Sequence, residues 1–162
     1  MQDISRVISK FIIALLVWCL IPISAQARTE VDTETPWQIW EIADKYGQEY
    51  NICPELILAV CYQESRYKVD AVSAAGDCFG IMQIQAKSHK SRMKRLGVTD
   101  LLDADQCIHV GADYLAELFE QYEDVGIVLG IYHGESTAFT KTSAYTTEIL
   151  ERSEHLERLH EK

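Results

Sequence analysis

A single glutamate lies on the apolar side of a predicted helix. Residues 53–65 read CPELILAVCYQES, in which Ile57, Val60 and Cys61 recur at the spacing of one helical face. Glu64 falls on that same face one turn later, where it points toward the core. Because burial disfavours the charged form of a carboxylic acid, the pKa of this side chain is expected to be raised. Such a group serves as a general acid near neutral pH, as the cleavage of glycosidic bonds requires.

Glycosidic cleavage usually employs a second carboxylate, which stabilises the developing positive charge or activates water. Asp70 and Asp77 are the nearby candidates, but each fits an ordinary loop or turn position better. If neither acts, the reaction needs another nucleophile, such as a group of the substrate itself. No HExxH spacing, nucleophile elbow or phosphate-binding glycine loop occurs in the sequence. We therefore expect no metal and no other cofactor.

The helix that carries Glu64 belongs to a chain with mostly helical patterning. Apolar periodicity and start and stop signals predict five helices around one irregular insertion. The insertion covers residues 69–85, and its FGIMQI run predicts a short strand or hairpin. The predicted helices span residues 37–47, 54–65, 106–123, 124–134 and 144–162. The pattern thus predicts a mainly α fold.

The same periodicity gives expectations about packing. Trp37 and Trp40 are expected to face the core from the first helix. Gly111 and Ala112 lie on the apolar stripe of the third helix, and their small size predicts close approach by another helix. The basic stretch at residues 87–95 is expected to be a solvated loop or short helix, with anionic peptide stems or wall polymers as an alternative contact.

The first 27 residues have the composition of a secretory signal peptide. Arg6 and Lys10 form a short basic region. An apolar run follows it and ends before the small-residue sequence AQA. The run is short for a transmembrane helix, so we expect cleavage after Ala27, with an uncleaved anchor as the alternative. The predicted organisation is a signal peptide (1–27), a short polar tether (28–36) and one domain (37–162). The expected location is extracytoplasmic, in the periplasm or cell wall.

The charge of the mature chain limits its partners. Removing the signal peptide takes away two of 15 basic and one of 25 acidic residues, which leaves a formal net charge of −11. Such a surface repels phosphate backbones, so nucleic acid is not an expected partner. We expect no stable membrane insertion after cleavage. The expected state is a monomer, with membership of a cell-wall-spanning machinery as a further option.

Four cysteines remain after cleavage of the signal peptide, an even number that permits two disulfides in an exported protein. Cys53 and Cys61 lie about 12 Å apart if both belong to one helix, which is too far for a bridge. Cys78 and Cys107 are therefore the best candidate pair. The alternative is that all four cysteines are small buried apolar residues.

Four motifs occur in a fixed order along the chain. They are ES at residues 64–65, Ser73, GIMQI at residues 80–84 and IYHG at residues 131–134. In this order they resemble the successive motifs of the lytic transglycosylase catalytic domain, of the soluble type, in the lysozyme-like superfamily. The resemblance extends from about Trp37 to the TSAYTTEIL segment. It implies an α+β lysozyme-like fold, in which a helical domain carries a β-hairpin or loop insertion beside the catalytic helix.

The resemblance also implies an activity and its residues. Glu64 would protonate the glycosidic oxygen between N-acetylmuramic acid and N-acetylglucosamine, and would then deprotonate the C6 hydroxyl of the muramyl sugar. The product is a 1,6-anhydro end formed without water, and the partner is the glycan strand of peptidoglycan. Tyr132 is implied to orient Glu64, and Tyr145 to lie opposite it. The implied substrate-binding residues are Ser73, Met82, Gln83, Tyr132 and Tyr145.

Two departures from the motifs leave alternatives open. His133 stands where the family commonly has asparagine, which suggests a wall-binding module with impaired catalysis as one alternative. The FGIMQIQAKSHK segment also resembles goose-type lysozyme, but Gln85 replaces an aspartate of that group, which favours transglycosylation over hydrolysis. Tyr132 and Met82 equally fit plain core positions. A helical interaction protein without a sugar site is the remaining alternative.

Overall fold

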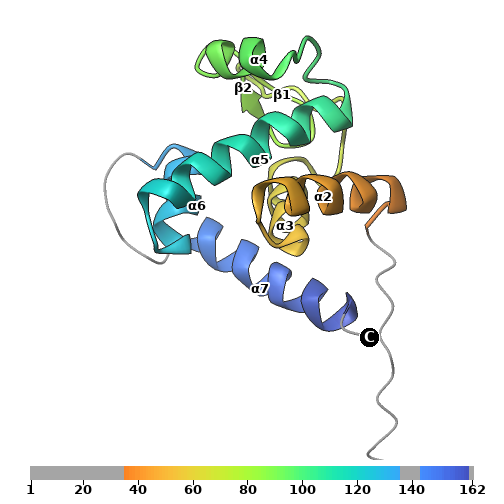
Figure 1. Cartoon of the computed structure of the whole chain (residues 1–162), viewed down its shortest axis with the longest axis vertical. Coiled ribbons are helices and arrows are strands. Elements are labelled where there is room, and N and C mark those ends of the chain that lie inside the picture. Colours follow the sequence, from red (N-terminus) through yellow and green to blue (C-terminus); the bar gives the residue numbers. More distant parts are fainter. Residues whose placement is uncertain (1–34, 136–142, 161–162) are drawn as a thin grey trace, which may run out of the picture. The chain divides into compact units, whose positions relative to one another are not determined.

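The computed structural model describes residues 35–135 and 143–160 of the chain. In these ranges it contains six helices and one two-stranded antiparallel sheet (Figure 1). In chain order the elements are α2 (Trp37–Tyr50), α3 (Pro54–Ser65), β1 (Cys78–Phe79), β2 (Ile84–Gln85), α4 (Lys90–Leu96), α5 (Ala104–Gln121), α6 (Val125–His133) and α7 (Ala144–His160). The predicted mainly α fold, with a short hairpin after the Glu64 helix, is confirmed.

Helix α3 lies in the middle of the core, since every residue from 56 to 61 is buried. Pro54 occupies its first turn, where the missing N–H costs no hydrogen bond. The helix ends at Ser65, and Arg66 adopts a left-handed conformation with φ of 55°. The Ser65 hydroxyl donates to the carbonyls of Cys61 at 3.1 Å and Ile81 at 2.8 Å. This end of α3 is therefore joined to the hairpin.

Helix α7 packs along α3 and is bonded to it near both ends (Figure 1). His160, in its last turn, lies 2.9 Å from Oε1 of Glu55, in the first turn of α3. Glu148, near the start of α7, accepts a hydrogen bond from Gln63 at 2.8 Å. The two helices are thus antiparallel, and the first turn of α7 lies beside the last turn of α3.

The β1–β2 hairpin pairs Cys78 with Gln85 and Phe79 with Ile84. Gly80 starts the connection between the strands with φ of 74°, a conformation that favours glycine. A Cβ atom at this position would lie only 1.9 Å from the carbonyl oxygen of Leu101. The turn therefore packs directly onto the loop that precedes α5.

Helix α5 is capped by Asp103, whose side chain accepts from the N–H of Gln106 at 2.9 Å. Gly111 was expected to admit a neighbouring helix, and this is wrong. The space above Gly111 is filled by the side chain of Met82 from the hairpin connection, whose Sδ would lie 2.3 Å from a Cβ atom. The small residue thus makes room for a loop side chain.

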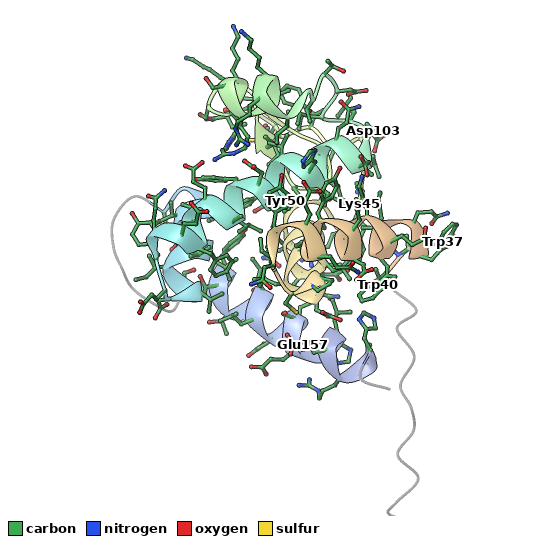
Figure 2. All side chains as sticks on the ribbon, viewed as in Figure 1. Trp37, Trp40, Lys45, Tyr50, Asp103 and Glu157 are labelled. Carbon is green, nitrogen blue, oxygen red and sulfur yellow. The ribbon has the colours of Figure 1, made fainter. Side chains whose placement is uncertain are left out.

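The first helix begins at Trp37 as predicted, but it ends later than predicted and its Trp37 does not face the core. It continues through Gly47 to Tyr50, because Gly47 packs closely against Ile52 and Pro54 and has no room for a side chain. Trp37 points away from the core at the start of α2 and is 63% exposed (Figure 2). The buried positions are Ile39, Ala43, Tyr46 and Gly47.

The predicted disulfide between Cys78 and Cys107 is wrong, because all four cysteines of the described residues are free thiols. Cys78 faces a pocket, whereas Cys107 is fully buried beside Gly80 and directs its Sγ to the carbonyl of Phe79 at 3.7 Å. Burial raises the pKa of the Cys107 thiol to about 11. Cys61 and Cys107 are buried as small apolar residues, whereas Cys53 is exposed.

The predicted signal peptide (1–27) lies outside the described residues, as does the tether (28–36) except for its last two residues. Among the helices that the structure describes, none has the length and apolar character needed to cross a bilayer.

Candidate active site

Glu64 lies in the last turn of α3 and faces a pocket of about 430 Å³. Its side chain is only 14% exposed. Burial raises the pKa of the carboxyl group, while a hydrogen bond from Tyr145 and the charge of His133 act in the opposite direction. The net shift is upward, so the proton is retained closer to neutral pH than on an ordinary glutamate. The predicted placement of Glu64 on the inner face of the helix agrees with this geometry.

Tyr145 is the side chain that holds the Glu64 carboxyl group. Its hydroxyl donates to Oε1 of Glu64 at 2.5 Å, from the first turn of α7. Tyr145 is itself nearly buried and does not belong to the pocket lining. The predicted position opposite the glutamate is therefore correct, but the hydroxyl lies behind the carboxyl group rather than toward a substrate.

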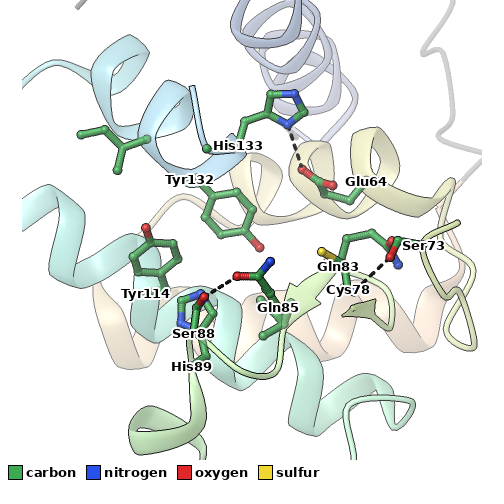
Figure 3. A pocket seen from close by; sticks show the side chains of 13 residues that line it. Glu64, Ser73, Cys78, Gln83, Gln85, Ser88, His89, Tyr114, Tyr132 and His133 are labelled. Carbon is green, nitrogen blue, oxygen red and sulfur yellow. Dashed lines mark hydrogen bonds and ion pairs between the residues drawn. The ribbon is translucent and has the colours of Figure 1, made fainter. Parts of the chain in front are cut away.

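His133, the last residue of α6, also faces Glu64 (Figure 3). Its Nδ1 lies 3.9 Å from Oε1 of Glu64. The imidazole ring stacks on the ring of Tyr145, with centroids 3.9 Å apart and an angle of 19° between the planes. The sequence singled out this residue only as a departure from the motif, and its proximity to both groups depends on the approach of α6 to α7.

Tyr132 does not make the contact that the resemblance implied. Its hydroxyl donates to the backbone carbonyl of Met82 at 2.9 Å, rather than to Glu64. The ring lines the pocket and lies close to Tyr114, at 5.5 Å between centroids. Tyr132 thus fixes the hairpin connection at the edge of the pocket, while Tyr145 takes the role of holding the glutamate.

Within the GIMQ segment, the Met82 side chain lies in the core and the Gln83 side chain lines the pocket. The Met82 side chain is fully buried against Gly111, so its predicted contact with substrate is wrong and the core alternative holds. Gln83 lines the pocket with φ of 48°, and its side-chain amide donates to the carbonyls of Gly80 at 2.9 Å and Ala71 at 3.2 Å. Its amide group is thereby held in place at the pocket wall.

Ser73 lines the same pocket as predicted, next to Gln83 and Cys78 (Figure 3). Its hydroxyl donates to Oδ1 of Asp77 at 2.9 Å and accepts from the backbone N–H of Cys78 at 3.0 Å. Asp77 also accepts from Gln85 at 3.2 Å. These bonds hold the pocket wall, and Asp77 itself does not line the pocket.

Sequence reasoning missed the part of the pocket wall that follows the hairpin. His89 stacks edge-on against Tyr114 with centroids 4.6 Å apart, and both rings line the pocket. Arg92 lies behind them, 4.7 Å above the Tyr114 ring, and its Nη1 is 2.5 Å from Nδ1 of His89. Burial and the Arg92 charge lower the pKa of His89, which favours a neutral ring. Only the proximity of residues 85–89 to the GIMQI motif could have indicated this wall.

The pocket offers carboxyl, hydroxyl, amide and aromatic groups on one concave surface, as sugar-binding sites do. Its lining residues are Glu64, Ser73, Cys78, Gln83, Ile84, Gln85, Ser88, His89, Tyr114, Ile131, Tyr132, His133 and Gly134. Glu64 is the only carboxylate among them. No group of three or more metal-ligating side chains suited to a metal ion occurs in residues 35–135 and 143–160.

Residues 41–152 match the sequence model of the family described as transglycosylase SLT domain, which accounts for most of the chain. The chain belongs to the transglycosylase SLT domain family. The resemblance read from the ordered motifs is therefore confirmed. In this SLT domain, Glu64 from α3 and the residues Gln83 and Ile84 from the hairpin line one pocket, although they lie on different elements.

Relatives of this SLT domain include proteins from a phage and from bacteria. The chain is 33% identical over 116 residues to a protein named transglycosylase from Enterobacteria phage PRD1, covering 70% of this chain and 42% of that one. It is 32% identical over 127 residues to an X polypeptide of Escherichia coli, covering 68% and 73% of the two chains. A membrane-bound lytic murein transglycosylase F from Maricaulis maris is 41% identical over 70 residues, covering 43% and 14%.

A solved structure shares the fold of the SLT domain. It is an inactive mutant of the lytic transglycosylase Slt from Pseudomonas aeruginosa, which superposes with a TM-score of 0.57 at 18% sequence identity. The match covers 84% of this chain and 25% of that one. The lysozyme-like fold is thus confirmed, and the chain spans less than half the length of the phage transglycosylase and a quarter of Slt.

Proposed function

We propose that this chain is an exported lytic transglycosylase that cleaves the β-1,4 bond between N-acetylmuramic acid and N-acetylglucosamine in peptidoglycan. The observation that carries the proposal is the single carboxylate of the pocket. Glu64 is nearly buried, holds its proton unusually well and stands alone among the lining residues. Hydrolytic glycosidases usually need two carboxyl groups, so this arrangement favours a reaction in which the substrate supplies the nucleophile.

The proposed reaction uses Glu64 twice. The protonated carboxyl group donates its proton to the glycosidic oxygen, and the bond from that oxygen to C1 of the muramyl sugar breaks. The resulting carboxylate takes the proton of the C6 hydroxyl while the C6 oxygen bonds to C1, which closes the 1,6-anhydro ring. Glu64 regains its proton and no water is consumed. The elevated pKa suits the first step and the Tyr145 bond supports the ionised form in between.

The remaining site residues are proposed to hold the glycan strand. Ser73 presents a hydroxyl and Gln83 an amide to the pocket, and both are fixed by bonds within the protein. Rigid polar groups of this kind can recognise sugar hydroxyl and acetamido groups at small entropic cost. The names of the lytic murein transglycosylase relatives support peptidoglycan as the substrate.

The place of action is part of the proposal. Residues 1–27 have the charge and apolar pattern of an export signal, with residues 28–36 as a tether and residues 37–162 as the catalytic domain. Peptidoglycan is an extracytoplasmic polymer, which accords with export. The proposed working unit is a monomer, free or as part of a cell-wall-spanning machinery.

Digestion of purified peptidoglycan followed by mass spectrometry tests the proposal. Wild-type protein is expected to release muropeptides whose muramyl ends lack one water, and Glu64→Gln to release none. Binding of both proteins to insoluble peptidoglycan without release of any product would support the wall-binding module instead. Absence of both binding and release would leave an interaction protein without a sugar site.

A second candidate function is hydrolysis by a lysozyme-type mechanism. Asp77 favours it, because this exposed carboxylate is bonded to the pocket residues Ser73 and Gln85 and could activate water from that side. Hydrated product ends in the same digest, lost in Asp77→Asn, would establish hydrolysis. Anhydro ends that persist in Asp77→Asn would support transglycosylation.

A further inference from the structure

His133 is the pocket residue that the motif resemblance leaves unexplained. It is 47% exposed, yet one face of its ring is covered by the ring of Tyr145. The stack has a centroid separation of 3.9 Å and nearly parallel planes, and the two residues come from different helices, α6 and α7. Aromatic pairs in contact stabilise each other beyond the burial of their surfaces.

Through this stack, His133 acts on the position of the Tyr145 hydroxyl. That hydroxyl makes the 2.5 Å bond to Oε1 of Glu64, so a rotation of the phenol ring would lengthen or break it. Tyr145 is the second residue of α7, and the His133 ring lies against one face of its phenol ring. A neighbouring ring face is therefore a direct restraint on the tyrosine rotamer.

The two contacts also distinguish the two oxygens of the carboxyl group. Tyr145 and His133 both approach Oε1, at 2.5 and 3.9 Å. Within the described residues, Oε2 of Glu64 has no hydrogen bond or ion pair. Oε2 is thus the oxygen that remains available to a ligand in the pocket.

We propose that His133 is a positioning residue for the general acid, which holds Tyr145 against Oε1 of Glu64 and so leaves Oε2 to exchange the proton with the sugar. This inference rests on the proposed function, and it adds an explanation of how the Glu64 carboxyl group is oriented. At 3.9 Å, Nδ1 of His133 is too far from Oε1 for a hydrogen bond. The histidine therefore acts on the carboxyl group through Tyr145 and through its charge, and it does not relay the proton.

The charge of His133 acts on the pKa of Glu64. The titratable groups around the imidazole and the stacked Tyr145 ring are Glu64 and Cys61 from α3 and Glu135, which follows α6. A protonated imidazole favours the ionised form of Glu64 and lowers its pKa. Removal of the charge, with the ring retained, should therefore raise the pKa of Glu64.

Three variants separate the ring from the charge. His133→Phe keeps the ring face and removes the nitrogen atoms, whereas His133→Asn and His133→Ala both remove the ring. We expect kcat on peptidoglycan to fall about twofold in the phenylalanine variant and about five- to tenfold in the other two. KM should stay within about twofold in all three, because a positioning residue acts on the reacting group. His155→Ala, in α7 but outside the pocket that Glu64 lines, is the matched control for loss of a histidine, and circular dichroism checks folding.

The pH profile supplies a readout that a purely structural role would not change. In His133→Phe, the loss of kcat/KM at high pH should move to higher pH, because Glu64 keeps its proton longer. Carbon-13 NMR titration of the Glu64 carboxyl group in wild type and His133→Phe should show the same direction without any substrate. Full kcat in the alanine variant, or unchanged titration of Glu64 in the phenylalanine variant, would overturn the proposal.

The outcomes also separate this inference from the proposed function. A wild-type protein no more active than Glu64→Gln contradicts the proposed function, and the NMR titration then decides the His133 contact alone. An active wild type with unaffected His133 variants contradicts only the positioning role. Equal loss of kcat in the phenylalanine and alanine variants would instead assign proton transfer to the imidazole and overturn the role proposed here.

Discussion

The Glu64 carboxyl group illustrates how one residue is prepared for proton transfer. Its helix places it on a buried face, the pocket wall excludes most water, and Tyr145 supports one of its two oxygens. Burial and hydrogen bonding act on its pKa in opposite directions, and burial dominates. Because neither the protonated nor the ionised form of Glu64 is strongly favoured, the same carboxyl group can donate a proton and later accept one.

Tyr145→Phe tests the hydrogen bond from Tyr145 to Glu64, which favours the ionised carboxylate. The variant keeps the ring and its stack on His133 but leaves the carboxylate without its donor. We expect kcat to fall about tenfold, as for loss of one hydrogen bond to a charged group. Because the lost bond favoured the ionised form, the pKa of Glu64 should rise, and the high-pH limb of kcat/KM should move upward. Tyr122→Phe, at the end of α5, is the control, and an unchanged pH profile for Tyr145→Phe would contradict the assignment.

Glu64→Gln should make the folded protein more stable at neutral pH while abolishing activity. The folded state raises the pKa of Glu64, so wild type loses stability as pH rises from the unfolded-state pKa through the folded-state value. Glutamine carries no charge and still accepts from Tyr145. Thermal unfolding should therefore show a higher Tm for the variant at about pH 7 and no such gain at about pH 3.5. An equal difference at both values would contradict the burial of the charge as its cause.

At the scale of elements, the hairpin positions the pocket through contacts behind it. Gly80 packs on the carbonyl of Leu101, Met82 fills the space above Gly111, and Tyr132 bonds to the carbonyl of Met82. The connection is therefore fixed from α5 and α6, with its side chains in the core. This leaves Gln83 as the residue of the turn that reaches the pocket.

Gly80→Ala and Gly97→Ala form a matched pair that tests this packing. Both glycines have positive φ, 74° and 72°, so each substitution costs about 1 kcal/mol for the backbone conformation. A Cβ at Gly97 would meet nothing within 4 Å, whereas at Gly80 it would collide with backbone. We expect Gly80→Ala to lower the free energy of unfolding by about 3 kcal/mol or more in chemical denaturation. Similar losses in the two variants would show that the hairpin does not pack tightly on the loop before α5.

The short helix α4 corrects the expectation that residues 87–95 are simply solvated. Arg92 is buried among Asp113, Glu117 and the Tyr114 ring, and Arg95 also bonds Asp113. The remaining positive charges of the stretch, Lys87, Lys90 and Lys94, are exposed. The periodicity of a seven-residue helix is too short to reveal its buried face, because only about two turns are sampled.

At the scale of the whole described domain, ionic contacts join pairs of helices, and three of the acids that make them have lowered pKa values. Asp105 bonds Lys45 between α5 and α2, Asp113 bonds Arg92 between α5 and α4, and Glu55 contacts His160 between α3 and α7. Burial opposes ionisation of all three acids, yet their donors prevail and hold each pKa below its usual value. Their protonation should therefore loosen contacts across the domain.

Acid is expected to destabilise the fold as a consequence. A depressed folded-state pKa contributes stability above the unfolded-state pKa, and this is lost as pH falls through the folded-state value. The denaturant midpoint should thus be lower at about pH 3 than at about pH 6.5. Asp113→Asn should be less stable than wild type at the higher pH and should lose less on acidification. A wild-type midpoint that stays constant or rises in acid would contradict this account.

Local chemistry made much of the fold predictable. Pro54 starts α3, Asp103 caps α5, and the spacing of Ile57, Val60 and Glu64 defines the inner face of α3. These features depend on residues within one or two turns of each other, which is the range over which periodicity and capping act. The expectations that failed depended on distant partners. The Cys78–Cys107 pair and the Met82 contact with substrate are of this kind.

The sequence by itself determined the helical domain, the inward placement of Glu64 and the family, because periodicity, caps and ordered motifs are local properties of the chain. Only the tertiary structure decided how Glu64 is held. Tyr145 is 81 positions away from Glu64 in the chain, and His133 comes from a third helix. Tyr132 and Tyr145 are both compatible with the motif pattern, and only the docking of α7 against the end of α3 determines which hydroxyl reaches the carboxyl group.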